Sequence, residues 1–310
     1  MSALQAAQTV MMIRPVDFSF NWETAPSNAF QNQQHGLDAA TIRNNAQKEF
    51  EDFVQLLKGH QVNVIVFNDT VEPATPDSIF PNNWISLDQH DRINIYPMHA
   101  ENRRLEKRQD IVDFFRQHYA VKQVNDFSAY EQENKFLEGT GSMVIDYVHD
   151  IMYACLSPRT HADVVEDFCS KMHYTPVTFT SVDEHGKEIY HTNVMMCIGT
   201  GYVVICLDSI RDISERNHVI GSFKETGHEI IDIDYAQMNQ FAGNMLEVCN
   251  PAGEHFLVMS KRAKDSLNTH QLNHIQKHAK ILSPDVNTIE TIGGGGVRCM
   301  MAEVFLSDQH

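Results

Sequence analysis

The sequence predicts an α/β fold in which one repeated unit forms a closed ring of five ββαβ-type blades. Three features predict it: paired apolar runs around short turns, a helical segment and a further strand after each pair, and polar residues at nearly equal spacing. Self-similarity at such a period is typical of repeat architectures. Closure through both ends of the chain leaves no sheet edge exposed. We therefore expect a single domain over residues 1–310.

The paired runs have the pattern of β-hairpins. Each pair is apolar and rich in β-branched residues, and each encloses a short polar or glycine-containing turn. The four complete pairs cover residues 84–98, 142–156, 194–207 and 245–260. A fifth hairpin is expected between the C-terminal run 299–305 and the N-terminal run 9–15.

A helical segment and a short strand complete each repeat. In residues 42–57, apolar side chains recur at steps of three and four, which places them on one face of a helix. The helix and strand pairs are 42–57 with 62–67, 109–120 with 121–124, 161–174 with 176–180, 216–227 with 228–234, and 269–279 with 280–283.

The composition excludes several classes of partner. The chain has 24 basic and 41 acidic residues, and its formal net charge of −17 repels phosphate backbones, so we expect no nucleic-acid partner. No apolar run is long enough to span a membrane, and the N-terminus lacks the pattern of a signal peptide. The six cysteines form no CxxC pair. We therefore expect a cytoplasmic protein with free thiols.

Five polar residues stand just before the hairpins at nearly equal spacing. They are Asn82, Glu138, His191, Asn244 and Cys299, separated by 56, 53, 53 and 55 residues. Equivalent places in a ring of repeats point towards the same axis. The pattern therefore predicts that a carboxylate, an imidazole and a thiol converge on one central site.

That combination is typical of nucleophilic catalysis by cysteine. Cys299 follows Arg298 and the glycine run 293–296, and a cation and an amide-rich turn both favour a thiolate. His191 is suited to general acid–base work near neutral pH. Glu138 can orient the imidazole and stabilise its charged form, as the third member of a nucleophile triad does.

No metal or cofactor is expected. No cluster in the sequence has the spacing of zinc ligands, and no GxGxxG or P-loop follows a strand. His270, His274 and His278 lie four residues apart, which suits either a metal stripe or a solvated helix face. We favour the solvated face.

Several segments resemble a known superfamily. The stretches PDSIFPNNW, LEGTGSMVID, CLSPRTH, YHTNVMM and GGGGVRCMM resemble those of the amidinotransferase and arginine deiminase superfamily, the penteins. Their order and spacing are similar to those of dimethylarginine dimethylaminohydrolases and of related proteins linked to citrulline use. The resemblance covers residues 14–305. It implies a single catalytic domain with a pseudo-fivefold, five-bladed α/β propeller, in agreement with the ring of repeats.

The resemblance also implies roles for individual residues. Cys299 would attack the central carbon of a guanidino or ureido group, His191 would be the acid–base group, and Glu138 would be its carboxylate partner. Arg159 matches the arginine that holds the α-carboxylate of the substrate, a task that suits a bidentate guanidinium. Asp77 matches an acidic residue that contacts the α-amino group or an amidine nitrogen.

The chain departs from this pattern at three positions. Relatives that handle arginine place carboxylates where this sequence has Asn82, Asn83 and Asn193. Asparagine offers both a donor and an acceptor, as does a neutral ureido group. Burying a cation without a paired charge is unfavourable by several kcal/mol. We therefore expect a citrulline-like substrate, a small amino acid, held by Asp77, Asn82, Asn83, Arg159, Asn193, Asn244 and Arg298.

The favoured function is a cysteine-dependent hydrolase that forms a covalent S-linked intermediate. An amidinotransferase that passes the group to an amine is a second interpretation, and a non-catalytic binding propeller is a third. Residues 18–37 have no clear periodicity, and we expect a substrate lid there. Trp22 and Trp84 either line the pocket or only pack. The sequence assigns no oligomeric state.

Overall fold

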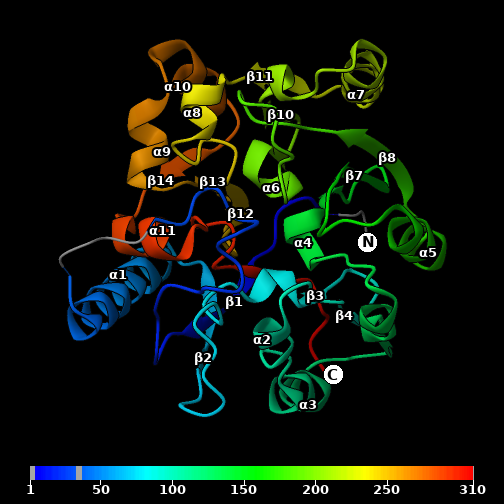
Figure 1. Ribbon diagram of the computed structural model, residues 1–310. Helices are drawn as coiled ribbons and strands as arrows, with labels where there is room; N and C mark the ends of the chain where they lie inside the picture. The colour runs from blue at the N-terminus through cyan, green and yellow to red at the C-terminus, as the bar shows by residue number, and fades with distance from the viewer. Residues whose placement is uncertain (1–3, 33–36, 310) are drawn as a thin grey trace.

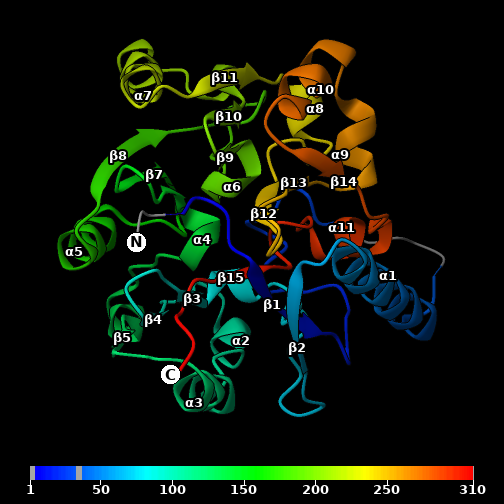
Figure 2. The same ribbon diagram turned by 180° about the vertical axis from the view of Figure 1, so that it is seen from behind.

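The computed structural model describes residues 4–32 and 37–309. It has a mixed α/β fold in which strands lie towards the centre and the longer helices lie around the outside (Figure 1). The view from behind shows the same arrangement (Figure 2). No helix in the described ranges has the length and apolar character needed to cross a membrane.

The strands form units of three with one shared plan. In each unit the middle strand pairs antiparallel with one neighbour and parallel with the other. The units are β2-β1-β15, β5-β4-β3, β8-β7-β6, β11-β10-β9 and β14-β13-β12. The strands are β1 Thr9–Arg14, β2 Asn63–Asn68, β3 Ile85–Leu87, β4 Arg92–Ile95, β5 Gln123–Asp126, β6 Val144–Asp146, β7 Ile151–Leu156, β8 Thr175–Thr180, β9 Met196–Gly199, β10 Tyr202–Ile205, β11 Glu229–Asp232, β12 Leu246–Cys249, β13 His255–Val258, β14 Lys280–Leu282 and β15 Ala302–Val304.

The two ends of the chain meet in one unit, as the sequence predicts. Strand β1 pairs antiparallel with β15, with Thr9 opposite Val304. Val304 also pairs with Leu87, which joins two units into one six-stranded sheet. Strand β15, the antiparallel partner of β1, therefore comes from the C-terminal part of the chain, a few residues after Cys299.

The five expected helices are present with shifted ends. They are α1 Ala39–Gly59, α3 Gln109–His118, α5 Ala162–Met172, α7 Ile213–Glu225 and α10 Thr269–Gln276. Helix α7 begins earlier than expected because the Asp212 side chain accepts the backbone N–H groups of Ser214 and Glu215. Helix α1 likewise begins after Asp38, whose side chain accepts the Thr41 N–H.

The sequence does not predict the short helices between these elements, because three to seven residues show no helical periodicity. They are α2 Glu101–Arg104, α4 Gly139–Ser142, α6 Thr192–Met195, α8 Tyr235–Met238, α9 Lys261–Ser266 and α11 Asn287–Gly293, together with the 3-10 helices η1 Pro81–Asn83, η2 Ser128–Glu133 and η3 Leu207–Ser209. Several of them carry candidate site residues.

Candidate active site

The five equally spaced residues occupy equivalent places in the fold. In each unit, we call the antiparallel partner of the middle strand the inner strand. Each of the five residues lies in the turn or short helix that precedes this inner strand. Asn82 lies in η1, Glu138 precedes α4, His191 precedes α6, Asn244 precedes β12, and Cys299 lies in the turn before β15. The equal spacing in the sequence therefore reflects one repeated structural position.

Glu138 and His191 form a buried pair. The Nε2 atom of His191 lies 2.7 Å from Oε2 of Glu138, and the other carboxylate oxygen accepts the backbone N–H of His99 at 2.9 Å. Burial alone would raise the pKa of Glu138, but the Arg159 guanidinium and the His191 hydrogen bond bring it well below its usual range. The carboxylate is therefore ionised and accepts the Nε2–H proton, which leaves the lone pair on Nδ1 of neutral His191.

Burial also changes the basicity of His191. It lowers the pKa of this imidazole to about 4, although Glu138 opposes the change. The ring is therefore neutral at neutral pH and able to accept a proton. A Cβ at Gly141 would lie 2.8 Å from Nδ1, so a glycine beside the ring keeps that nitrogen accessible.

The Cys299 thiol is held between two amides. Nδ2 of Asn244 lies 3.3 Å from the sulfur, and Nδ2 of Asn193 lies 3.5 Å from it. Burial raises the pKa of Cys299, while the Asn244 amide, the nearby Arg298 charge and the Asn193 amide act in the opposite direction. Both contacts are donors, so they stabilise negative charge on sulfur as it develops.

Arg298 does not reach the cavity with its side chain. Its guanidinium pairs with Glu303 at 2.7 Å and donates to the Met301 carbonyl at 3.0 Å. The carboxylate of Glu303 holds the guanidinium away from the cavity beside Cys299, and the expected contact with substrate stays a prediction. Arg298 acts on the site through its charge and through its backbone N–H, which donates to Oδ1 of Asn244 at 3.2 Å.

The glycine run allows close approach of the backbone, as predicted. Gly294 has φ +66° and ends α11, a conformation that favours glycine. A Cβ at Gly295 would lie 2.9 Å from the Phe80 ring. This loop forms one wall of the cavity beside Cys299.

Arg103 is a central residue of the site that the sequence did not reveal. Its fully buried guanidinium forms a two-point ion pair with Glu106, at 2.9 and 2.8 Å. It also donates to Oδ1 of Asn83 at 2.8 Å. Because arginine has no acceptor, the oxygen of Asn83 must face Arg103. Nδ2 of Asn83 is therefore turned away, beside Gly141, where it is buried without a hydrogen-bond partner.

Asp77 and Arg159 lie under the suspected lid. Oδ2 of Asp77 accepts from Asn21 at 2.8 Å and from Thr24 at 3.1 Å, while its Oδ1 has no partner. Burial raises the pKa of Asp77, although Arg103 opposes this. Arg159 donates to the Thr24 carbonyl at 3.3 Å and to Ser27, and stacks over the Tyr190 ring at 4.8 Å.

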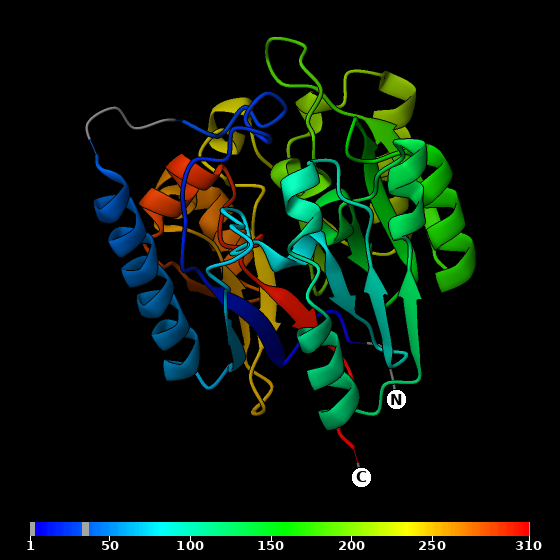
Figure 3. The ribbon, with the colours of Figure 1, turned by 60° about the horizontal axis from the view of Figure 1, so that its bottom comes forward.

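The lid segment closes the cavity in this structure. Residues 18–32 of the expected 18–37 lid are described, whereas residues 33–36 lie outside the described part. The segment lies over the end of the molecule where the glycine loop is found (Figure 3). The cavity beneath it has a volume of about 20 Å³, enough for a water molecule but not for an amino acid. Thr24 and Asn28 of this segment line the cavity, and its role as a lid stays a prediction.

The remaining predicted residues are placed as follows. Asn82 is fully buried, donates to Thr140 at 3.3 Å and does not line the cavity. Trp84 packs in the core and Trp22 is exposed, so neither lines the cavity. His274 and His278 each contact Glu229, and a lysine joins this ion-pair cluster. Two of the three histidines therefore belong to a surface cluster with Glu229 and Lys277.

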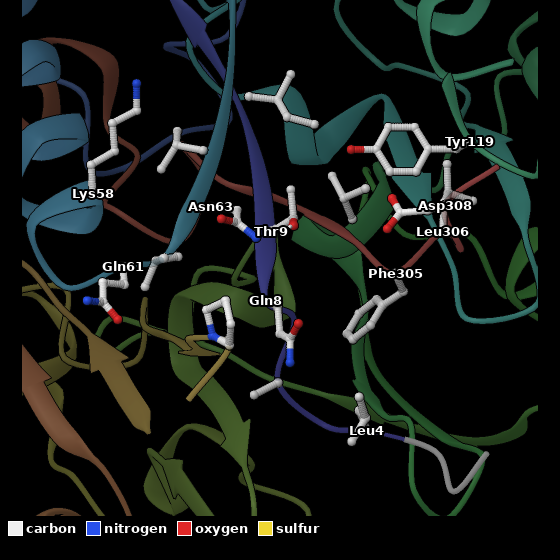
Figure 4. Close-up of a pocket in the computed structure, with 16 residues that line it drawn as sticks. Leu4, Gln8, Thr9, Lys58, Gln61, Asn63, Tyr119, Phe305, Leu306 and Asp308 are labelled. Atoms are coloured by element: carbon white, nitrogen blue, oxygen red, sulfur yellow. Dashed lines mark hydrogen bonds between the residues drawn. The ribbon is translucent and has the colours of Figure 1, made fainter. Parts of the chain in front are cut away.

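A larger cavity lies elsewhere in the molecule. It has a volume of about 720 Å³ and lies between the N-terminal segment, β1, β2 and the C-terminal segment. Figure 4 shows Lys58 and Gln61 on one side of it, and Tyr119 and Asp308 on the other. It contains none of the predicted site residues, whereas the smaller cavity is lined by Asp77, Asn83, Arg159, His191 and Cys299.

A family model matches most of the chain. The model of a family described as N,N dimethylarginine dimethylhydrolase, eukaryotic, matches residues 14–306. A comparison with curated proteins finds no match.

Solved structures share the fold at low sequence identity. One is the N-terminal domain of ArgZ, a cyanobacterial arginine dihydrolase, in a cysteine-to-serine variant bound to substrate: 14% identity, 96% of this chain and 97% of that one, TM-score 0.74. This chain spans only 41% of full-length ArgZ. Another is a histidine-to-glycine variant of dimethylarginine dimethylaminohydrolase with an S-methyl-L-thiocitrulline adduct: 14% identity, 96% and 99% coverage, TM-score 0.63. These likenesses establish a pentein-type fold.

Proposed function

Since this chain belongs to the eukaryotic N,N dimethylarginine dimethylhydrolase family, we propose that it cleaves the ureido C–N bond of a citrulline-like amino acid through a covalent cysteine intermediate. It is a hydrolase of non-peptide carbon–nitrogen bonds, and its substrates are of the arginine type. The preference for a ureido over a guanidino group comes from the hydrogen-bonding groups that line the cavity.

The orientation of the Asn83 amide is the observation that carries the proposal. Arg103 occupies its oxygen, so the group that remains beside His191 and Gly141 is an unpartnered N–H donor. A guanidinium has only hydrogen-bond donors, so it cannot accept from this N–H, and two donors would face each other. A ureido oxygen accepts from it, which satisfies a buried donor that otherwise destabilises the site.

The charges near the thiol support the same substrate class. Both oxygens of Glu138 are occupied by His191, Arg159 and the His99 backbone N–H. The side chains in contact with the sulfur are the neutral amides of Asn193 and Asn244. A cationic guanidinium would therefore lose its hydration beside Cys299 without gaining a paired carboxylate there.

The other end of the cavity suits the amino-acid head group. Arg159 can exchange its contacts with the lid, at Thr24 and Ser27, for the α-carboxylate of the substrate. The free Oδ1 of Asp77 is an acceptor for the α-ammonium. In the closed structure, the lid therefore contacts Arg159 and Asp77, the two residues proposed to bind the head group of the substrate.

The proposed mechanism has two steps. The Cys299 thiol transfers its proton to Nδ1 of His191, and the sulfur adds to the ureido carbon. The Asn83 amide donates to the oxygen on which negative charge develops. His191 then protonates the departing amine as the C–N bond breaks, giving ornithine and an S-carbamoyl cysteine. Water attacks this S-linked thiocarbamate with His191 as base, the C–S bond breaks, His191 returns the proton to the Cys299 sulfur, and the carbamate released decomposes to ammonia and carbon dioxide.

Glu138 stabilises the imidazolium that forms during both steps, because its pKa is low enough to keep it ionised throughout. Burial keeps His191 neutral before the reaction, so it begins as a base. These two perturbations act in the direction that the mechanism needs.

Two measurements test the covalent step. Citrulline incubated with the purified protein is expected to give ornithine and ammonia, and Cys299→Ala is expected to give neither. Rapid acid quenching followed by peptide mass spectrometry is expected to find a carbamoyl group on Cys299. Turnover by Cys299→Ala at the wild-type rate would exclude this mechanism. Formation of an amidino or carbamoyl product on added glycine would favour the amidinotransferase instead.

The same proposal extends to the architecture. The five three-stranded units are proposed to form one closed five-bladed propeller and a single catalytic domain over residues 1–310. Contacts between the inner strands support closure: β15 pairs with β3, β6 and β12 both pack on β9, and Ala7 pairs with Val248 of β12.

A further inference from the structure

A second cluster of ligand-type side chains lies away from the catalytic cavity. It consists of Asp146 at the end of β6, His149 in the β6–β7 turn, and His228 just before β11. One ligand atom from each residue lies within 4.8 Å of the other two. The cluster therefore connects the β8-β7-β6 unit to the β11-β10-β9 unit, which lie next to each other in Figure 2.

We propose that Asp146, His149 and His228 bind a Zn²⁺-like divalent cation that cross-links these two units. The donor set fits, because two imidazoles and one carboxylate are ligands that zinc takes in proteins. Sequence spacing did not reveal the site because His228 is distant in the chain and reaches the cluster only through the fold.

The two donor separations that involve Asp146 bracket the value expected for a zinc site. Oδ2 of Asp146 lies 2.8 Å from Nδ1 of His149 and 3.8 Å from Nε2 of His228. Tetrahedral ligands with bonds near 2.1 Å lie about 3.4 Å apart. The observed separations lie on either side of this value, so small side-chain rotations bring the three donors around one ion. Water would complete the coordination.

The hydrogen bonds of Thr226 determine which nitrogen of His228 faces the cluster. The Thr226 hydroxyl donates to the Ser222 carbonyl at 3.0 Å or to the Phe223 carbonyl at 3.2 Å. With that proton on a carbonyl, the hydroxyl accepts from Nδ1–H of His228 at 2.7 Å, and this is the tautomer that metal binding at Nε2 requires. The lone pair of neutral His228 is then on Nε2 and points at the carboxylate of Asp146. In this tautomer, a cation between Nε2 and the carboxylate of Asp146 is bound by both acceptors.

This arrangement is the usual second layer of a metal site. An imidazole ligand commonly donates its other N–H to a fixed acceptor, which orients the ring and selects the tautomer. Asp146 is held in the same way, because its Oδ1 accepts the backbone N–H groups of Val148 and His149 at 3.1 Å each. Asp146 and His228 are buried and His149 is partly exposed, which gives the ion a route of entry.

The test uses Co²⁺ and Zn²⁺ with the full-length chain in a Cys299→Ala background, because a thiol of this kind can also bind these ions. The protein is stripped with a chelator and titrated with Co²⁺ at pH 7.5. The expected result is one equivalent of tight binding with the visible absorption of tetrahedral cobalt, displaced by Zn²⁺. Saturating Zn²⁺ is expected to raise the melting temperature.

The matched variants separate this site from others. His149→Gln changes a partly exposed side chain and is expected to fold, to weaken Zn²⁺ binding at least about 100-fold and to abolish the rise in melting temperature. Thr226→Val keeps all three ligands and is expected to weaken binding about tenfold. His274→Gln, in the separate cluster with Glu229, is expected to leave binding unchanged. Equal affinity in the parent and His149→Gln, or no binding by the parent, would overturn the proposal.

Discussion

Replacing Asn83 by aspartate changes one atom at the point where the proposed preference is decided. Arg103 pairs with one carboxylate oxygen as it does with Oδ1 of the amide, at 2.8 Å. The second oxygen then takes the place of Nδ2 beside His191 and Gly141. The cavity loses its donor to the ureido oxygen and gains an anionic acceptor. Citrulline turnover should therefore fall, and turnover of arginine should rise.

The size of the effect follows from the role of this donor. A hydrogen bond to a charged group contributes about 1.5–3 kcal/mol, and removal of one oxyanion donor lowers kcat about 10²–10³-fold. We expect kcat/KM for citrulline to fall about 100-fold or more, mainly through kcat, because the interaction strengthens as charge develops. For arginine, the new carboxylate pairs with the guanidinium, and kcat/KM should rise.

The assay is initial-rate measurement of ornithine from citrulline, and of citrulline or ornithine from arginine, by mass spectrometry. Asn83→Ala is the matched control, since it removes the donor without adding a charge. Both variants should lose citrulline turnover, and only Asn83→Asp should gain arginine turnover. Thermal melting shows that each variant is folded. Wild-type citrulline turnover in a folded Asn83→Asp protein would refute the reasoning.

Three further outcomes are expected. Arg103→Met removes the donor that orients the Asn83 amide, so kcat for citrulline should fall. In a double-mutant cycle, Asn83→Ala should lower kcat little further in the Arg103→Met background. Burial lowers the pKa of His191 from 6.5 to about 4, so on acidification this imidazole is protonated in the unfolded chain before it is protonated in the folded protein. Stability should thus fall on acidification from about pH 6.5 to 4, by up to about 3 kcal/mol, and less in His191→Gln, as urea unfolding would show. Ser27→Ala loosens the closed lid over Arg159, so KM for citrulline should fall, and an unchanged KM would argue against competition between lid and substrate.

Much of the fold was predictable because its signals are local. Hairpins with short turns and one amphipathic helix, such as 42–57, recur once per unit, and the repeat placed Glu138, His191 and Cys299 in register. The short helices were missed because α4 and α6, with four residues each, are too brief for periodicity.

The site was less predictable where function depends on long-range contacts. Arg103 lies in a run of charged residues, and nothing local distinguishes it from the neighbouring Arg104 and Lys107. Only the fold buries its guanidinium against Glu106 and Asn83. Arg298 was expected in the cavity because it precedes Cys299, but the adjacent Glu303 pairs with it instead.

The central claim is that a ureido group is preferred over a guanidino group. The most direct measurement is a competition in which equal concentrations of citrulline, arginine and dimethylarginine react with the wild-type protein, and the loss of each is followed by mass spectrometry. The ratio of the loss rates gives the ratio of kcat/KM values. We predict that citrulline is consumed first, with ornithine as product. Faster consumption of arginine or dimethylarginine, with accumulation of citrulline, would contradict the account.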